Sequence, residues 1–345
     1  MIFSIPMILA GFVLLVKGGD WLVDGSVALA QKARLSSMVI GLTVMGFGTS
    51  APELLVSAQA AWTGSSGIAL GNVAGSNIAN IALILGVTAL MRPVPVGRRA
   101  LLIDMPFMLL SMAALVIAAW NGVIERWMGL CMFAALVAFV WWEVVVSRKE
   151  EKRKLVEQSK RSENSDYSEN SDLSENSDLS EEAVPSDLST FRAVATVLLS
   201  LSALVLGARW LVAGSTDVAR QLGDMLGAEP AAMERIIGLT VVALGTSLPE
   251  LFASVIAARR GETDMAVGNI IGSVTFNILC VVGVSSTIRP IADAWTPFIT
   301  DYIVMCVLGL LLWVMLRIGF RLTRAEGIVL LCIYALYIVR LAQIN

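Results

Sequence analysis

The stretch from Gly41 to Val87 occurs twice in this chain. It returns as Gly238 to Val284, and roughly half of the aligned positions are identical at one constant offset, more than shared apolar composition produces by chance. Each copy carries one glutamate in an apolar setting, within GLTVMGFGTSAPEL in the first and GLTVVALGTSLPEL in the second. Because a lone charge at bilayer depth costs several kcal/mol, two equivalent carboxylates indicate a shared polar site.

Composition defines the class of protein. Of the 345 residues, 57% are hydrophobic and only 15% are charged, which is too apolar for a soluble domain. The apolar runs do not alternate with polar residues as barrel strands do, so they predict an all-α integral membrane protein. We expect ten transmembrane helices, at about 3–30, 37–61, 68–91, 101–120, 124–147, 191–219, 235–258, 265–286, 297–316 and 325–342.

The ten predicted helices divide into two halves of five. Residues 1–147 form the first five-helix repeat, 191–345 the second, and 148–190 a disordered linker containing SENSDYSENSDLSENSDLSEE. An odd number of helices per repeat makes the second half enter the membrane from the opposite side. The expected architecture is therefore a pair of inverted repeats, in which ions bind near the bilayer centre where broken helices meet.

The distribution of basic residues predicts the orientation. If the linker is cytoplasmic, most Lys and Arg residues between the spans lie inside, so both termini lie outside. The segment MIFSIPMILA has no basic region, and we interpret the first run as a retained helix and not as a cleaved signal peptide. We expect a multi-pass protein of the plasma membrane, in a bacterium the inner membrane.

The duplicated motif also predicts a break in each helix that carries a glutamate. Pro52 and Pro249 have no N–H group for the carbonyl four residues earlier. Backbone oxygens near Gly46 and Ala243 are therefore expected to be available as ligands.

Polar side chains converge on the same positions. In each motif a threonine and a serine precede the glutamate by four and three residues, so all three share one helical face. The next helix of each repeat adds a serine and an asparagine four residues apart, in GNVAGSNIAN and GNIIGSVTFN. The candidate side-chain ligands are Thr49, Ser50, Glu53, Ser76, Asn80, Thr246, Ser247, Glu250, Ser273 and Asn277.

This set of ligands selects a class of ion. The chain has no histidine, and its four cysteines show no metal-ligand spacing, which removes the usual ligands of zinc and copper. Carboxylate, hydroxyl, amide and carbonyl oxygens suit Ca²⁺ better than Mg²⁺. Two ionised glutamates could be neutralised by one Ca²⁺ or by two or more Na⁺, so alternating occupation would make the site an exchanger. No permanently bound cofactor is expected.

The motifs GTSAPE and GTSLPE, each followed by a GN..GS segment and an asparagine, resemble the two alpha repeats of the sodium/calcium exchanger family. The resemblance implies Ca²⁺ and Na⁺ as transported ions and Glu53 and Glu250 as central acidic ligands. It also implies that the first and sixth helices slide against the others. Some members that the chain resembles have an aspartate where Asn277 stands, so coupling to Na⁺ and coupling to H⁺ both stay open.

Other functions account less well for the sequence. The glutamates could merely fix helix packing, either by sharing a proton or by forming buried ion pairs with Lys17 or Arg209, but neither cation lies in the duplicated motif. A cation channel could use the same oxygens, whereas paired inverted sites better suit a gate that opens to one side at a time. An intramembrane hydrolase with Ser50 or Ser247 as nucleophile would lack a histidine base.

Partners and the remaining polar residues give weaker signals. No nucleotide-binding motif is present, nothing indicates a nucleic-acid partner, and protein partners cannot be predicted. Asp20 and Asp24 are expected to pair locally or reach the interface. Asp104 and Asp301 occupy equivalent positions of the two repeats, each near the beginning of a predicted helix. A favourable interaction of the carboxylate with the helix N-terminus is expected to explain both.

Overall fold

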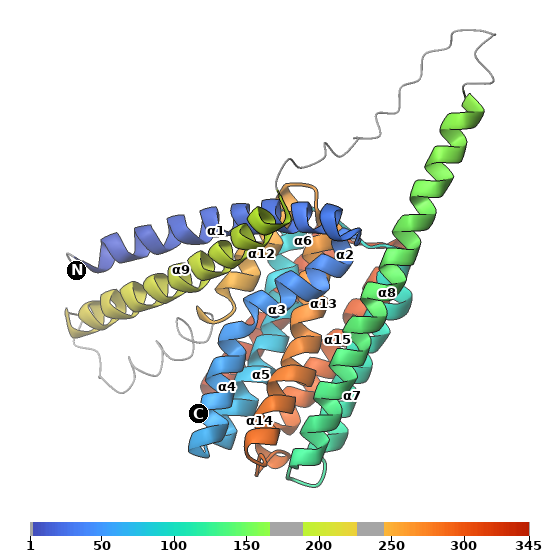
Figure 1. Ribbon diagram of the computed structural model, residues 1–345. Helices are drawn as coiled ribbons and strands as arrows, with labels where there is room; N and C mark the ends of the chain where they lie inside the picture. The colour runs from blue at the N-terminus through green and yellow to red at the C-terminus, as the bar shows by residue number, and fades with distance from the viewer. Residues whose placement is uncertain (1–2, 166–188, 226–244, 345) are drawn as a thin grey trace.

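The computed structural model describes residues 3–165, 189–225 and 245–344. Nearly all of them are helical (Figure 1), which confirms the predicted all-α class. An antiparallel pair of two-residue strands, β1 (Val94–Pro95) and β2 (Arg321–Leu322), joins two connections. Most of the SENSD repeat, Ala243 and the beginning of the predicted span 235–258 lie outside the described residues.

The first half contains three helices that include π-helical segments. Its elements are α1 (Ser4–Ala33), α2 (Ser37–Ile40), η1 (Gly41–Met45), α3 (Gly46–Thr49), α4 (Ala51–Thr63), α5 (Ser66–Ile78), η2 (Ala79–Ile84), α6 (Leu85–Met91), η3 (Ala100–Asp104), α7 (Met105–Ala119) and α8 (Arg126–Ser165).

The second half repeats the order of the first as far as the structure describes it. Its elements are α9 (Thr190–Met225), α12 (Leu248–Arg259), α13 (Thr263–Phe276), η5 (Asn277–Val282), α14 (Gly283–Ile288), η6 (Thr296–Phe298), α15 (Ile299–Gly319) and α16 (Arg324–Ile344).

Seven helices in the described ranges are long and apolar enough to cross a membrane, or eight when the bent pair of 37–49 and 51–63 is one span. This makes the chain a multi-pass membrane protein. Helix α16, which is 21 residues long, covers the predicted tenth span. The beginning of the predicted span 235–258 lies outside the described residues, so the count of ten stays a prediction.

Helix α8 is longer than the sequence predicts. It continues to Ser165, whereas the linker was expected to begin at residue 148. The extension is rich in Lys, Glu and Arg, which are good helix formers, so leaving the apolar region does not end the helix.

The centre of the bundle is formed by the two helices that follow the glutamate helices. Of the most apolar stretch in Thr263–Ile288, 94% is buried inside the protein, and the corresponding value for Ser66–Met91 is 78%. Helix α13 packs directly against α2, η1 and α3. A Cβ on Gly272 would overlap the Leu42 carbonyl, so glycine permits this close approach.

Helices α1 and α9 form a separate layer. They lie side by side and cross the rest of the bundle at a steep angle (Figure 1), and only 28% and 33% of their most apolar stretches are buried. Their backbones approach closely at Gly11 and Gly207. Small residues on facing helices allow such contact, and the pair can thus behave as one unit.

An ion-pair cluster ties α1 to the connection after α12. Arg260 donates to Asp20 at 2.7 Å and also contacts Asp24. These aspartates therefore pair with a residue from the other half of the chain and not within their own helix.

Candidate functional site

Both glutamate helices begin at a break in the backbone. Ser50 has φ −84° and ψ 5° between α3 and α4, and the helical segments 37–49 and 51–63 are bent by 46° at this point. Ser247 has φ −90° and ψ 3° directly before α12. In both cases proline occupies the first turn, where its missing N–H is tolerated. The break predicted from Pro52 is confirmed. In the second half, α12 begins at Leu248, and most of the segment before it lies outside the described residues.

Glu53 and Glu250 lie in the first turns of α4 and α12, and their exposed fractions are 0% and 1%. Ser50 Oγ of the first half donates to Glu250 Oε1 of the second half at 3.1 Å. The two carboxyl groups are close enough to interact electrostatically. The structure thus brings the two predicted acidic residues into one polar centre, each at a helix N-terminus whose free N–H groups favour negative charge.

Several polar atoms of the predicted ligand residues have no hydrogen-bond partner among the described residues, although each is buried. An orphaned buried polar atom costs about 1–3 kcal/mol, and native structures contain few of them. Here they come from both halves: Glu53 Oε1 and Oε2, Glu250 Oε2, Asn80 Oδ1 and Nδ2, Asn277 Oδ1 and Ser247 Oγ. Nearly all are oxygens, which is the set of atoms that a cation would satisfy.

The hydroxyls of Thr49, Ser76 and Thr246 also belong to this centre. The Glu53 carboxyl interacts electrostatically with Ser76 and Thr246, but no hydrogen bond of normal geometry joins them. Thr49 Oγ1 donates to the Met45 carbonyl at 3.0 Å. These side chains surround the carboxyls without neutralising them.

Two asparagines that the ligand prediction missed fix the glutamate helices. Asn72 Nδ2 donates to the Glu53 carbonyl at 3.2 Å and to Ser57 Oγ at 2.9 Å. Asn269 Nδ2 makes the same two bonds in the second half, to the Glu250 carbonyl at 3.4 Å and to Ser254 Oγ at 2.8 Å. The GN pair at equal positions in both repeats was the signal in the sequence.

The predicted asparagines Asn80 and Asn277 lie at the beginning of the π-helical segments η2 and η5. Asn277 Nδ2 donates to Asn77 Oδ1 at 3.2 Å, which leaves the Asn277 oxygen free of partners in the described part of the chain. Helix α4 packs against η5, and α12 packs against η2. Each glutamate helix therefore contacts the π segment of the opposite half, and such segments frequently occur at functional sites.

The two predicted backbone ligands are the carbonyl groups of Gly46 and Ala243. The Gly46 carbonyl accepts hydrogen bonds from Ser50 N at 3.2 Å and from Ser273 Oγ at 3.4 Å. It is not the vacant acceptor that the helix break was expected to leave, because the bend lies at Ser50 and the turn below it stays intact. Ala243 lies outside the described residues.

No basic residue neutralises the centre in the ranges that the structure covers. Neither Glu53 nor Glu250 forms an ion pair there. Arg209 instead lines a cavity of about 300 Å³ with Pro52, Thr246 and Pro249. The alternative in which Glu53 and Glu250 form buried ion pairs with Lys17 or Arg209 therefore has no support in the described residues.

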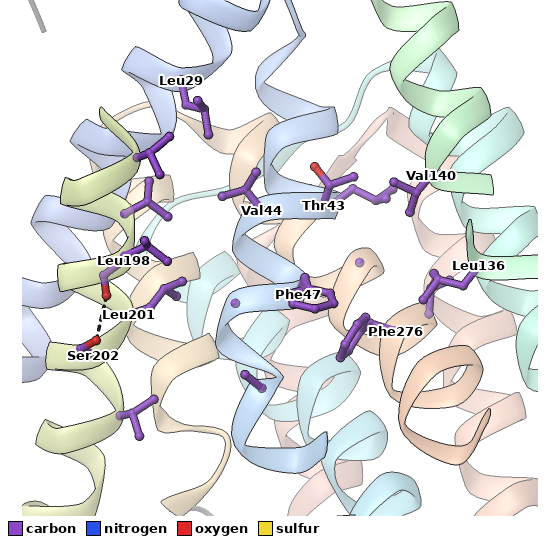
Figure 2. Close-up of a pocket in the computed structure, with 18 of the residues that line it drawn as sticks. Leu29, Thr43, Val44, Phe47, Leu136, Val140, Leu198, Leu201, Ser202 and Phe276 are labelled. Carbon is purple, nitrogen blue, oxygen red and sulfur yellow. Dashed lines mark hydrogen bonds between the residues drawn. The ribbon is translucent and has the colours of Figure 1, made fainter. Parts of the chain in front are cut away.

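Figure 2 shows a larger cavity of about 870 Å³, and none of its lining residues in the described part of the chain is a predicted ligand. Its wall is apolar and includes Leu198 and Leu201 of α9, Val44 of η1, and Phe47 and Phe276, whose rings meet edge to face at 4.5 Å. The cavity separates α9 from the core over part of its length.

Fold and polar centre together define a helical membrane protein with a buried, oxygen-rich site shared by its two halves. The family model of the sodium/calcium exchanger proteins matches residues 3–145 and 192–342. The chain belongs to this family of exchangers, so it is a transporter and not an enzyme.

The individual relatives support the same assignment. The chain is 34% identical to the putative antiporter CaxA of Alkalimonas amylolytica and 35% identical to the sodium/calcium exchanger MaX1 of Methanosarcina acetivorans, in each case over 98% of both chains. Among solved structures, the sodium-calcium exchanger NCX_Mj matches with a TM-score of 0.78 and 28% identity, over 98% of this chain and 99% of that chain.

Proposed function

We propose that this protein exchanges Ca²⁺ for Na⁺ across the membrane by alternating access, and that the ions bind between Glu53 and Glu250. The observation that carries the proposal is the cluster of buried, unpartnered oxygens contributed by both halves. Membership in the exchanger family and the likeness to NCX_Mj supply the class of transported ions.

The proposed ligands favour calcium on chemical grounds. Carboxylate, amide and hydroxyl oxygens from α4, α12 and the helices behind them can supply the six to eight contacts that Ca²⁺ takes. The predicted set stays as Thr49, Ser50, Ser76, Asn80, Thr246, Ser247, Ser273 and Asn277 around the two glutamates, while Gly46 would first have to exchange a hydrogen bond.

Exchange follows from charge balance. Two ionised carboxylates hold one Ca²⁺ or at least two Na⁺, and not both loads together. An unloaded centre with two buried charges is costly to move through the bilayer, so the protein would switch sides mainly when it is occupied. This condition separates an exchanger from a channel.

Coupling to H⁺ is the second candidate, and Asn277 favours it. Asn277 has an amide at the position where some family members have a third carboxylate, so the site carries fewer negative charges for the transported ions to neutralise. Protonation of Glu53 and Glu250 could discharge the centre for its return, in place of Na⁺.

We further propose the membrane arrangement that the sequence predicts: ten spans as two inverted repeats, 1–147 and 191–345, with both termini outside and a cytoplasmic linker between them. Helices α1 and α9 would slide together against the remaining bundle. Their mutual glycine contacts and the apolar cavity beside α9 support this division.

Transport in liposomes tests the proposal. With purified protein, we expect Ca²⁺ uptake driven by an outward Na⁺ gradient and nearly abolished in Glu53→Gln and in Glu250→Gln, because each substitution removes half of the site's charge. Asp301→Asn, which removes a carboxylate from α15, is the matched control and should retain uptake. An outward H⁺ gradient in Na⁺-free buffer distinguishes the two couplings, and normal uptake in both glutamine variants would refute the site.

A further inference from the structure

A second pair of carboxyl groups is buried on helices that carry none of the central ligands. Asp104 ends η3, and Glu143 lies on α8; the exposed fraction of both is 0%. Asp104 lies inside a continuous helix and makes no capping hydrogen bond, so the helix N-terminus does not account for it as the sequence suggested.

The Asp104 carboxyl interacts electrostatically with the Glu143 carboxyl and with the Arg99 guanidinium. Arg99 donates to Glu143 Oε2 at 2.8 Å and also contacts Glu150, whose side chain is half exposed. Arg99 itself is 20% exposed, so the cluster reaches from the buried pair towards the aqueous surface at this end of α8.

Three oxygens of the pair have no partner in the described ranges: both oxygens of Asp104 and Oε1 of Glu143. Two ionised carboxylates cannot satisfy each other, because neither has a donor. Their two negative charges face one arginine, and Glu150 shares that arginine. The neighbouring helix α15 contributes Arg317, but its guanidinium lies over the Trp313 ring at 4.9 Å.

In the corresponding helices of the second half, α15 and α16, the charge of the acidic residue is balanced by a basic residue. Asp301 accepts a hydrogen bond from Tyr337 at 3.0 Å and interacts with the positive charge of Arg340. At the repeat offset, Asp301 corresponds to Asp104 and Arg340 corresponds to Glu143. One half thus has a carboxylate and a cation where the other has two acids.

We propose that Asp104 and Glu143 bind one proton between them and form a proton-binding site separate from the central ion site. A proton from the aqueous side binds an oxygen of one carboxylate, and the facing oxygen of the other accepts the hydrogen bond. With Arg99, the buried group then has no net charge, as Asp301 and Arg340 have none.

A metal ion fits this place less well. Two side chains offer three free oxygens, fewer than the six that Ca²⁺ requires. The described residues also contain no group of three or more acidic, cysteine or histidine side chains arranged to hold a metal ion.

Infrared difference spectroscopy on the full-length protein tests the proposal directly. The measurement uses the Glu53→Gln/Glu250→Gln background, so the central carboxyls do not contribute and the result is independent of the proposed exchange. We expect a pH-dependent C=O band of a buried protonated carboxyl that disappears in Asp104→Asn and in Glu143→Gln. The band should persist in Asp301→Asn and should not change with Na⁺.

Thermal unfolding gives a second readout. A site that stays protonated when folded, and ionises near pH 4 when unfolded, makes the folded state hold the extra proton. Stability therefore falls as pH rises above that value, by up to tenfold in the unfolding equilibrium constant per pH unit, until the folded site ionises. We expect Asp104→Asn to flatten this slope and Asp301→Asn to leave it unchanged.

The contrary results are equally definite. A band that survives both Asp104→Asn and Glu143→Gln, a band removed by Na⁺ at constant pH, or equal pH slopes in the parent protein and in Asp104→Asn would each overturn the proton site.

Discussion

The inner and outer helices of the two halves have diverged to different extents. In the inner helices, Asn72 and Asn269 make the same pair of hydrogen bonds at the repeat offset. In the outer helices, the position of Glu143 in α8 is occupied by Arg340 in α16. A shared site needs matching geometry from both sides, whereas the outer walls only need to satisfy their own buried charges.

Removing either inner asparagine should break the symmetry most strongly. Asn72→Ala and Asn269→Ala each leave a buried glutamate carbonyl and a serine hydroxyl without their donor. We expect a loss of about 1–3 kcal/mol in stability and a marked loss of Ca²⁺ uptake from each, because the glutamate helices lose their support. Thermal unfolding and liposome flux measure the two effects.

Similar losses from the two alanine variants would support equivalent halves. A full loss from one and none from the other would show that only one half positions the ion ligands. The control is Glu125→Gln, which changes an exposed side chain on the connection before α8 and leaves both asparagines in place. It should match the parent protein in both measurements.

Substitutions in the outer helices of the second half, α15 and α16, should have a smaller effect on stability. Tyr337→Phe removes the hydrogen bond to Asp301, but Arg340 still interacts with the carboxylate. We expect a loss of about 1 kcal/mol in stability with uptake retained. A loss of Ca²⁺ uptake in folded Tyr337→Phe would contradict the separation of these outer helices from the site.

The smallest effect on stability is expected at Arg260. Its ion pairs with Asp20 and Asp24 are about one third exposed or more, so Arg260→Gln should cost less than about 1 kcal/mol. Because these pairs hold α1 to the opposite half, the exchange rate should nevertheless change. An unchanged rate across a range of salt concentrations would show that the ion pairs do not restrain α1.

Much of the site could be predicted from the residues. Duplication identified Glu53 and Glu250, and Pro52 located the break before α4, because a missing N–H acts locally. The roles of Asn72 and Asn269 could not be assigned, since an asparagine on a helix gives no sign of which carbonyl it reaches. The Gly46 carbonyl was expected to be free, but Ser273 from the other half of the chain donates to it.

The outer helices show the same limit. Asp104 was assigned to a helix N-terminus because sequence shows an acid near the beginning of an apolar run. Its partner Glu143 is distant along the chain, and only the packing of the continuous helix η3–α7 against α8 brings them together.

The sequence alone determined a membrane protein with two related halves and one glutamate in each broken helix, because composition, repetition and proline act through the local chain. The tertiary structure decided which oxygens lie together without partners, and it separated the α1–α9 layer from the core. Those features depend on contacts between segments that are distant along the chain. The hydropathy and spacing of residues are local properties and do not identify such contacts.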